Sequence, residues 1–316
     1  MSHKILIIGC GNIGAGYDFE SDYVQTHAKA FFLHQAFQIT FFDLDTELAQ
    51  RVAGRYRSEF LTDIDQVNFS DFDCVSICTP TTTHARFLTR AFESEVPLVI
   101  CEKPVASEVD DLIGLIETYH RSNTKVIVNY MRRFLPCFAE LRKYISQVQK
   151  DESLTNVSVR YQRGFVNNAG HALDLVQYLL SDEIKLTDIT TFNRVFDAFP
   201  NDPTMSLQAI WNKANINVTG LANVKFSCFE IDLFFEYHRI QIKEAGNTIE
   251  VLKAEKGGEY FKPLLVEKNK SRHNCLENYM KPVAQLAADI LNGEHKEDNF
   301  EEAAYLNIRM LNYIKP

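Results

Sequence analysis

Three glycines that directly follow a short apolar run constrain this 316-residue chain more than any other feature of its sequence. Residues 4–8 predict a buried strand, and Gly9, Gly11 and Gly14 follow it with the spacing GxGxxG, where a helix should begin. The first glycine permits a tight turn, the second lets the backbone approach a pyrophosphate, and the third lets helix and strand pack closely. A glycine-rich turn without a ligand is the alternative interpretation. The strand before the motif and an acidic residue after the next strand favour a dinucleotide site.

The first part of the chain alternates apolar runs with amphipathic helical patterns. The predicted strands cover residues 4–8, 38–42, 74–78 and 98–101, and the predicted helices cover residues 47–57, 83–92 and 108–120. Strands without a polar side are typical of a parallel sheet that is covered by helices on both faces. The sequence therefore predicts an α/β fold with a doubly wound parallel sheet in a dinucleotide-binding domain over residues 1–123. The end of the alternation predicts a second, α+β domain over residues 124–316.

The second domain contains a strand pattern with strict period two. Apolar and mostly acidic residues alternate along residues 229–237, which predicts a strand with one buried face and one more polar face. Residues 238–252 predict two more strands that are joined by a hairpin turn at the sequence AGN.

Asp43 ends the second predicted strand, and a carboxylate there can accept hydrogen bonds from both ribose hydroxyls of NAD. It would repel the 2′-phosphate of NADP, so NAD is the expected cofactor and NADP is less favoured. Asp43 could instead cap the next helix, although Asp45 is better placed for that role. The expected cofactor contacts of this part of the chain are Gly9, Gly11, Asn12, Ile13, Gly14 and Asp43.

Asp43 lies 29 residues after Gly14, a longer interval than the typical spacing of about 20 residues. Residues 15–26 (AGYDFESDYVQT) have no helical period and predict an irregular loop that interrupts the first helix, which resumes at residues 27–34. A long loop beside a cofactor is more often functional than accidental. A lid over the nicotinamide and a subunit contact both remain open.

Composition excludes several other functions. A net charge of -9 lacks the basic bias of proteins that bind nucleic acid. The seven cysteines contain no CxxC pair and lie mostly in apolar runs, so neither a disulfide framework nor a metal site is expected. The apolar runs are far shorter than the roughly 18 residues that cross a bilayer, and the N-terminus lacks a secretory apolar region. We expect a cytoplasmic protein without nucleic acid, membrane or metal partners.

Four motifs in order carry a family resemblance. The glycine motif is followed by TPxxxH in CTPTTTHARFL, by EKP in CEKPVAS and by RRFxP in VIVNYMRRFLP. Together they resemble the glucose-fructose oxidoreductase and inositol dehydrogenase family, called Gfo/Idh/MocA. The resemblance extends through GHALDLVQYLL to EEAAYLNIRMLNYI, which is nearly the whole chain. It implies an NAD(P)-dependent oxidoreductase whose second domain has an open-faced, largely antiparallel sheet, with nicotinamide and substrate between the domains.

The resemblance places Lys103 of EKP beside the nicotinamide and the substrate hydroxyl, and Glu102 near the cofactor ribose. Strand ends in a parallel sheet open onto the ligand crevice, and an ammonium there can polarise a substrate oxygen. A solvated turn is the alternative interpretation of the bare tripeptide. Three further residues are expected on the cofactor side, the last of them by packing rather than catalysis: Thr79, Pro80 and His84.

His171 and Asp174 match the HxxD part of the family motif DxGxHxxD. A histidine, with its ordinary pKa of about 6.5, suits proton transfer near neutrality, and Asp174 one turn later could orient it. A histidine satisfied by backbone at the start of a helix is the alternative. Asn167 replaces the usual first aspartate, and since an amide cannot take a proton, the burden shifts to His171 and Lys103. Some relatives that act on nucleotide-linked sugars also carry asparagine there.

Tyr130, Arg132 and Arg133 follow the next strand, and one arginine could bind an anionic substrate group, unless both are simply solvated. We expect hydride transfer between nicotinamide and a carbinol carbon of a sugar, cyclitol or nucleotide-sugar derivative, with Lys103 and His171 as catalytic residues. The expected substrate-binding residues are Lys103, Tyr130, Arg133, Asn167, His171 and Asp174. The resemblance also implies a homodimer or homotetramer.

Two other functions remain open. A noncatalytic NAD(P)-binding regulator with this fold is conceivable because of Asn167. Reduction of a nonsugar carbonyl or imine would not need the HxxD pair.

Overall fold

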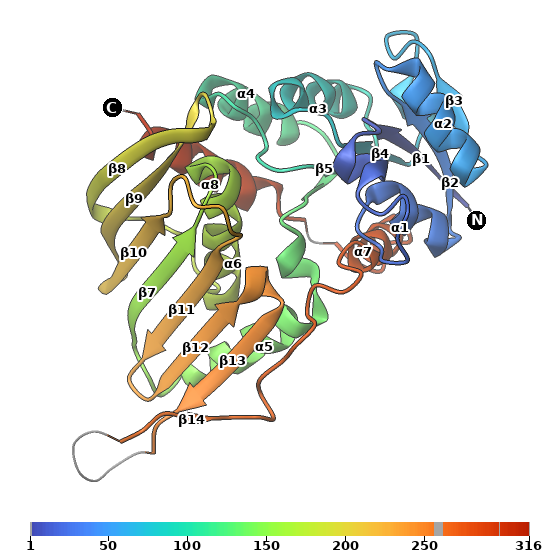
Figure 1. Cartoon of the computed structure of the whole chain (residues 1–316). Coiled ribbons are helices and arrows are strands. Elements are labelled where there is room, and N and C mark those ends of the chain that lie inside the picture. The colour runs from blue at the N-terminus through green and yellow to red at the C-terminus, as the bar shows by residue number, and fades with distance from the viewer. Residues whose placement is uncertain (1, 256–261, 297, 316) are drawn as a thin grey trace. The chain divides into compact units, whose positions relative to one another are not determined.

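The computed structural model describes residues 2–255, 262–296 and 298–315, and the chain divides into two compact units. The first unit contains Met1–Met131 and Asn278–Ile308, and the second contains Arg132–Glu277 and Arg309–Pro316. Figure 1 shows the course of the chain through the elements of each unit. The chain thus leaves the first unit after Met131 and returns to it at Asn278.

The first unit contains a six-stranded sheet in which every pair of neighbouring strands is parallel. Its strands are β1 (His3–Ile8), β2 (Phe37–Phe42), β3 (Glu59–Leu61), β4 (Cys74–Ile77), β5 (Leu98–Cys101) and β6 (Lys125–Val128). Their order in the sheet is β3-β2-β1-β4-β5-β6. This confirms the predicted doubly wound parallel sheet, and it puts the reversal of strand order between β1 and β4, where such sheets bind ligands. The sequence-based boundary at residue 123 would leave β6 outside this sheet, whereas β6 pairs with β5.

Helices cover both faces of the first sheet. They are α1 (His27–His34), α2 (Thr46–Tyr56), α3 (His84–Glu93), α4 (Val109–Tyr119), α7 (Lys281–Leu291) and the start of α8 (Phe300–Tyr313). Short turns lie at η1 (Asn12–Gly16), η2 (Phe69–Asp71) and η3 (Thr81–Thr83). Helices α1 and α7 pack together on one face, and α3 and α4 pack together on the other (Figure 1). The side chains of Ile5, Leu6, Ile7 and Ile8 in β1 are 0% exposed, and burying each one stabilises the fold by roughly 1.5–3 kcal/mol.

The returning segment closes the outer edge of the first sheet at β6. The Asn299 side chain accepts a hydrogen bond from the Val128 amide at 2.8 Å and donates one to the Val128 carbonyl at 3.0 Å. The Asp298 carboxylate accepts from the Val126 amide at 3.3 Å. These contacts satisfy backbone groups that a further strand would otherwise bond.

The second unit is built on an eight-stranded sheet with helices on one face. Its strands are β7 (Leu154–Tyr161), β8 (Thr187–Phe199), β9 (Asp202–Trp211), β10 (Ala214–Gly220), β11 (Phe229–Phe235), β12 (His238–Lys243), β13 (Thr248–Lys253) and β14 (Leu265–Val266). The order is β14-β13-β12-β11-β7-β10-β9-β8, with β7 and β10 parallel and the other described pairs antiparallel. Helices α5 (Pro136–Val148) and α6 (Gly170–Leu180) pack together, and short turns lie at η4 (Met131–Phe134), η5 (Phe165–Ala169) and η6 (Glu244–Gly246). The predicted antiparallel second domain is confirmed.

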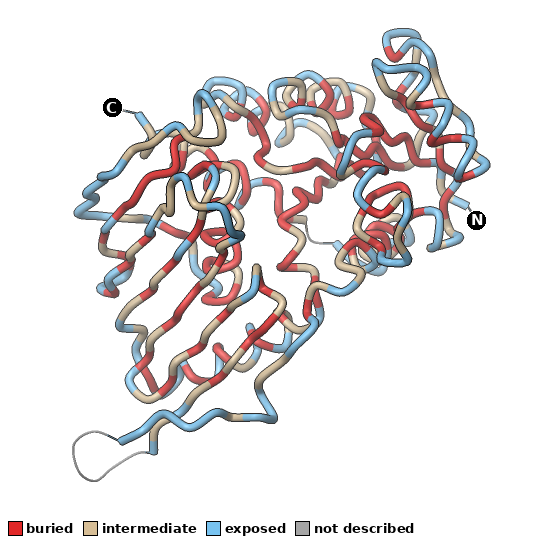
Figure 2. The backbone as a smooth tube through the Cα atoms, viewed as in Figure 1, coloured by how far each residue is buried: buried red, intermediate tan, exposed pale blue. Residues whose placement is uncertain are grey.

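The two faces of the second sheet differ in polarity. Residues alternate between buried and partly exposed along β12 (Figure 2), whereas in β11, where the sequence predicts strict period two, Asp232 is buried as well. On the more exposed face, the Asp232 carboxylate of β11 lies 2.9 Å from Arg160 of β7 and 2.8 Å from Arg239 of β12. Charges on this face are therefore paired across three neighbouring strands.

None of the helices in the described ranges combines the length and the apolar composition that membrane crossing needs.

Candidate functional site

Of the three glycines in the glycine loop after β1, Gly9 and Gly14 are required by packing within the protein, and Gly11 is not. A Cβ at Gly9, where φ is 97°, would lie 2.8 Å from the Cys78 carbonyl, and a Cβ at Gly14 would lie 2.0 Å from the Gly9 carbonyl. Among the residues that the structure describes, and apart from its chain neighbours, a Cβ at Gly11 would meet no atom within 4 Å, and its φ of -67° is not in the left-handed region. The free space at Gly11 fits the close approach of a pyrophosphate, so the loop fits a dinucleotide.

Asp43 is fixed beside this loop at the end of β2. Its carboxylate accepts hydrogen bonds from the Cys10 amide at 2.7 Å and from the Asp45 amide at 2.9 Å. Asp45 caps α2 by accepting from the Leu48 amide at 3.0 Å, so α2 does not need Asp43 as its cap. This geometry supports Asp43 as a ribose ligand.

The His84 side chain bridges the segments that follow β4 and β5. Its side chain is buried, with Nδ1 2.9 Å from the Pro104 carbonyl and Nε2 2.8 Å from the Thr79 carbonyl. Burial lowers the pKa of His84, so the ring is neutral and donates to one of these carbonyls. Its position ties Thr79, after β4, to Pro104, after β5, and indicates a packing role.

Glu102 at the end of β5 lies in a buried polar cluster. Its Oε1 lies 3.0 Å from His27 Nε2 and accepts from Asn129 Nδ2 at 2.6 Å, and His27 Nδ1 lies 2.8 Å from the Ser76 hydroxyl. Burial opposes the charged form of Glu102, but hydrogen bonds from His27 and Asn129 lower its pKa. Burial likewise opposes the charged form of His27, yet hydrogen bonds and charge from Cys78 and Glu102 raise its pKa to about 10. Glu102 and His27 therefore form a buried ion pair.

Lys103 and Tyr130 follow neighbouring strands at the same edge of the first sheet. Lys103 is partly exposed directly after Glu102, and its peptide bond to Pro104 is cis. Tyr130 follows β6 and is 2% exposed. Because Asn129 bonds to Glu102, the ends of β5 and β6 are held together.

The loop at residues 15–26 is irregular and precedes α1, as predicted. The buried Asp18 closes it by accepting from the Gln25 amide at 2.6 Å, the Thr26 amide at 2.9 Å and the Thr26 hydroxyl at 2.7 Å. Tyr17 and Tyr23 are more than half exposed on the loop. Hydrogen bonds to Asp18 therefore fix the base of the loop, and two aromatic side chains of the loop are exposed to solvent.

In the second unit, Asp202 fixes the turn that carries Asn167. Its carboxylate accepts from the Val166 amide and from the Asn167 amide, both at 2.8 Å. Gly164, with φ at 84°, leaves room for that carboxylate, since a Cβ there would lie 2.3 Å from Asp202 Oδ2. The Asn167 backbone is thus held before α6, which carries His171 in its first turn.

Asp174 of α6 forms a buried ion pair with Arg133. Arg133 Nη2 lies 2.9 Å from Asp174 Oδ1, and Arg133 Nε donates to Asp174 Oδ2 at 3.1 Å. The neighbouring Arg132 donates to the Ala245 carbonyl and stacks on the Phe229 ring, 4.0 Å from its centroid. Both arginines are buried, so they are not a solvated surface pair.

The predicted site residues fall into two groups, one in each unit. The first group follows the carboxyl ends of β1, β2, β4, β5 and β6 and contains the glycine loop, Asp43, Thr79, Pro80, Glu102, Lys103 and Tyr130. The second group lies around η4, η5 and α6 and contains Arg133, Asn167, His171 and Asp174. His27, Asn129 and Asp202 support these groups and were not predicted. The sequence feature that could have indicated His27 is its position at the start of the resumed helix, residues 27–34.

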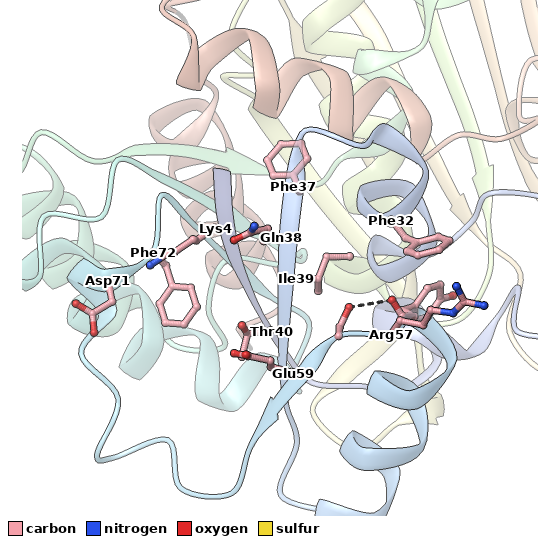
Figure 3. Close-up of a pocket in the computed structure, with 12 residues that line it drawn as sticks. Lys4, Phe32, Phe37, Gln38, Ile39, Thr40, Arg57, Glu59, Asp71 and Phe72 are labelled. Carbon is pink, nitrogen blue, oxygen red and sulfur yellow. Dashed lines mark hydrogen bonds between the residues drawn. The ribbon is translucent and has the colours of Figure 1, made fainter. Parts of the chain in front are cut away.

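A hollow of about 560 Å³ lies elsewhere in the first unit (Figure 3). Lys4, Gln38, Thr40, Glu59 and Phe72 are among its lining residues, and none of the predicted site residues lines it. It flanks β2 on the side of its first residues, whereas the glycine loop and Asp43 follow the carboxyl ends of strands. It is therefore separate from the candidate site.

A parallel sheet with a glycine loop after β1 and an acidic residue after β2 defines the class of dinucleotide-binding Rossmann proteins. Residues 3–130 match the family GFO_IDH_MocA, described as an oxidoreductase family with an NAD-binding Rossmann fold. Over these residues the chain is similar to this family, in agreement with the resemblance seen in its motifs.

Two curated relatives are inositol dehydrogenases. Inositol 2-dehydrogenase from Rhizobium meliloti is 28% identical over 198 residues, which cover 58% of this chain and 56% of that protein. Inositol 2-dehydrogenase 3 from Saccharopolyspora erythraea is 25% identical over 240 residues, which cover 72% of this chain and 68% of that protein. The chain therefore spans little more than half the length of the first relative.

Two solved structures share the fold. UDP-N-acetylglucosamine 3-dehydrogenase from Acidithiobacillus ferrooxidans superposes with a TM-score of 0.71 at 17% identity, covering 99% of this chain and 96% of that chain. The super-repressor mutant of Gal80p from Saccharomyces cerevisiae superposes with a TM-score of 0.76 at 13% identity, covering 99% and 95%. An enzyme and a repressor thus occur on this fold.

Proposed function

We propose that this protein is an NAD-dependent dehydrogenase that acts on a CH–OH group of a sugar, cyclitol or nucleotide-sugar derivative. The observation that carries the proposal is that the glycine loop, Asp43 and Lys103 follow strands of one parallel sheet at its carboxyl edge. A dinucleotide lies across that edge in open α/β sheets. The activities named for the relatives from Rhizobium meliloti and Saccharopolyspora erythraea support a polyol substrate.

Bound nicotinamide supplies a hydride acceptor at C4. In the proposal, the Lys103 Nζ holds the substrate hydroxyl and takes or stabilises its proton, and His171 of the second unit shares that proton transfer. Asn167 and Tyr130 bind other substrate hydroxyls. Asp174 and Arg133 hold each other rather than an anionic substrate group, which favours a neutral polyol portion at this position.

The test is NADH fluorescence with a panel of sugars, inositols and nucleotide sugars. NADH should form with at least one class of polyol. A protein that binds NAD but oxidises no member of the panel, and reduces none of the corresponding ketones, contradicts the proposal.

A second candidate function is a noncatalytic NAD(P)-binding regulator. It is supported by Asn167 in place of an acid and by the fold shared with the super-repressor mutant of Gal80p. Turnover of the parent and of Asn167→Asp distinguishes the two functions. If the protein is an enzyme, the parent itself turns over a member of the panel. If it is a regulator, neither the parent nor Asn167→Asp turns over any of them. Cytoplasmic location and homodimer or homotetramer assembly also stay predictions.

A further inference from the structure

The tip of the β8–β9 hairpin holds the turn η5 that precedes α6. Asp202 is the first residue of β9, and its carboxylate accepts hydrogen bonds from the Val166 amide and from the Asn167 amide, both at 2.8 Å. Further along β9, the Thr204 hydroxyl accepts from the Gly164 amide at 3.0 Å. Backbone amides of one short segment are therefore bonded to side chains of one strand.

The backbone around this contact leaves room for the Asp202 carboxylate. Gly164 has a φ of 84°, in the left-handed region, and a Cβ at this residue would lie 2.3 Å from Asp202 Oδ2. Hydrogen bonds from amides to a charged carboxylate are roughly twice as strong as bonds between neutral groups. Removing the charge of Asp202 should therefore loosen the turn at Val166 and Asn167.

The charge of Asp202 also limits which side chain suits position 167. In an Asn167→Asp variant, the new carboxyl carbon would lie at most about 7 Å from the Asp202 oxygen, because three covalent bonds of about 1.5 Å add to the 2.8 Å contact. Two carboxylates this close raise each other's pKa, since each charge disfavours the other. The Asn167 amide avoids this repulsion and can still donate to and accept from a hydroxyl group.

We propose that Asp202 is a positioning and specificity-determining residue: it fixes Asn167 for an uncharged hydroxyl, and its negative charge disfavours a substrate that carries a phosphate or carboxylate at this place. The inference rests on the proposed dehydrogenase function and narrows its substrate class to polyols whose ring at Asn167 carries no anionic group. Arg133 agrees with this class, because its guanidinium is paired with Asp174 at 2.9 Å.

The first test compares Asp202→Asn with Asp197→Asn. Asp197 is the matched control, because it lies on the same hairpin and accepts from the Thr204 hydroxyl at 2.7 Å and from the Asn223 amide at 2.8 Å. In Asp202→Asn, the ¹H–¹⁵N signals of the two amides that bind Asp202 should shift upfield and exchange faster with solvent. Asp197→Asn should leave both signals at their parental positions.

Steady-state kinetics measure the effect on the substrate. With a polyol that the parent oxidises, Asp202→Asn should raise KM at least about tenfold, with kcat changed less than about threefold and NAD affinity within about twofold. This split is expected because substrate binding is lost while the chemical step is kept. Asp197→Asn should change each constant less than about threefold.

Matched substrates test the excluded charge. The pairs are myo-inositol with inositol monophosphate and glucose with glucose 6-phosphate. Of each pair in which the parent oxidises either member, it should oxidise the neutral member at least about tenfold better in kcat/KM. Preference for the phosphorylated member overturns the inference, and this arm needs no variant that could fail to fold.

A double-mutant cycle tests the repulsion between residues 167 and 202. Asn167→Asp should lower the melting temperature by several degrees in the parent, and by less in the Asp202→Asn background, where one carboxylate remains. Equal effects in both backgrounds contradict the repulsion.

Failure of the inference is distinguishable from failure of the proposed function. Parental amide signals in Asp202→Asn, or an unchanged KM in a protein that oxidises polyols, overturn the role of Asp202 and leave the dehydrogenase intact. A parent that turns over no polyol contradicts the proposed function instead. The amide signals and melting temperatures then still decide whether Asp202 holds the turn.

Discussion

The Glu102 carboxylate accepts a hydrogen bond from the buried Asn129 side chain and lies 3.0 Å from the buried His27 ring, directly before the partly exposed Lys103. A carboxylate that is paired and hydrogen-bonded in this way keeps one rotamer and one charge state. The residue before Lys103 is therefore rigid. Rigid support of this kind is what a catalytic amine requires to hold a substrate oxygen within hydrogen-bonding distance.

Lys103→Met should keep NAD affinity within a few fold of the parent and lower turnover of the true substrate by at least about a hundredfold, or about 2.7 kcal/mol. The pyrophosphate and ribose would be held by the glycine loop and Asp43, which do not include residue 103. Steady-state kinetics with a cofactor titration check this. Turnover at the parental rate would show that Lys103 is not the catalytic amine.

Asp43 predicts a preference for NAD(H) over NADP(H) of at least tenfold in affinity, or about 1.4 kcal/mol. Its carboxylate is held in place by two amides, so it cannot turn away from a 2′-phosphate without losing both bonds. Fluorescence titration with both reduced cofactors measures the ratio. Equal or reversed affinities would contradict the role of Asp43.

His27→Gln should remove a pH dependence of stability. The folded-state pKa of His27, about 10, lies above the ordinary value of 6.5, so its stabilisation is complete below pH 6.5 and is lost as the pH rises toward 10. Between pH 7 and 9 this residue lowers the free energy of unfolding by up to about 1.4 kcal/mol per pH unit, and the variant should lack that slope. Urea unfolding at several pH values measures it.

His84→Gln serves as the control for this measurement. Burial lowers the pKa of His84, so its effect on stability lies below pH 6.5, where protonation of the unfolded state makes stability rise with pH. The slope from pH 7 to 9 should persist in His84→Gln. Equal slopes in the parent and His27→Gln would contradict the buried ion pair.

At the scale of elements, the glycine motif after β1 contains one glycine that packing requires, Gly14, and one that leaves room for a ligand, Gly11. Gly14→Ala should destabilise the protein strongly, because its Cβ would lie 2.0 Å from the Gly9 carbonyl. Gly11→Ala should leave the melting temperature nearly unchanged and weaken NAD binding by at least tenfold, since its Cβ would fill space that only a ligand approaches. Calorimetry and cofactor titration test both variants. Unchanged NAD affinity in Gly11→Ala would contradict a pyrophosphate at that position.

Elements with a strong local pattern could be predicted from the sequence, and short ones could not. Helix α2 and strand β11 carry clear helical or alternating periods, and both formed within about two residues of the predicted bounds. Strand β3 has three residues and exists because β2 offers it an edge, so no local pattern marks it. The glycine loop and EKP motif indicated candidate site residues, but the supporting His27 and Asp202 depend on contacts 75 and at least 35 residues apart.

At the scale of the whole molecule, the more exposed face of the second sheet is the surface where we expect copies of the chain to meet. Its charges are paired, as with Asp232 and its two arginines, so an interface there would be polar. Asn215→Glu adds one negative charge on this face and should shift a homodimer or homotetramer toward a 36.3 kDa monomer.

Gln50→Glu adds the same charge at an exposed position of α2 and is the matched control. It should leave the assembly unchanged. Light scattering coupled to size-exclusion chromatography gives the masses. A parent protein that is monomeric at low salt would remove this surface from consideration.

The return of Asn278–Ile308 to the first unit is the feature of the fold that was hardest to predict from the sequence. The local pattern predicts α7 and α8 as amphipathic helices, but not which sheet they serve. That choice is made by contacts across the chain, such as Asn307 accepting from the Ala106 amide at 3.1 Å. Sequence periodicity describes a face, and it does not name the partner of that face.

The two hydrogen bonds between the Asn299 side chain and the backbone of Val128 in β6 join residues that are 171 positions apart. During synthesis on the ribosome, β6 emerges long before Asn299, so the outer backbone groups of this strand stay open while Arg132–Glu277 of the second unit is being translated. An open strand edge is a template for pairing with another chain. The first sheet is therefore synthesised early, but its edge at β6 is covered only when Asn299 has been made. Until then the nascent chain exposes an unpaired strand edge that can associate with other chains.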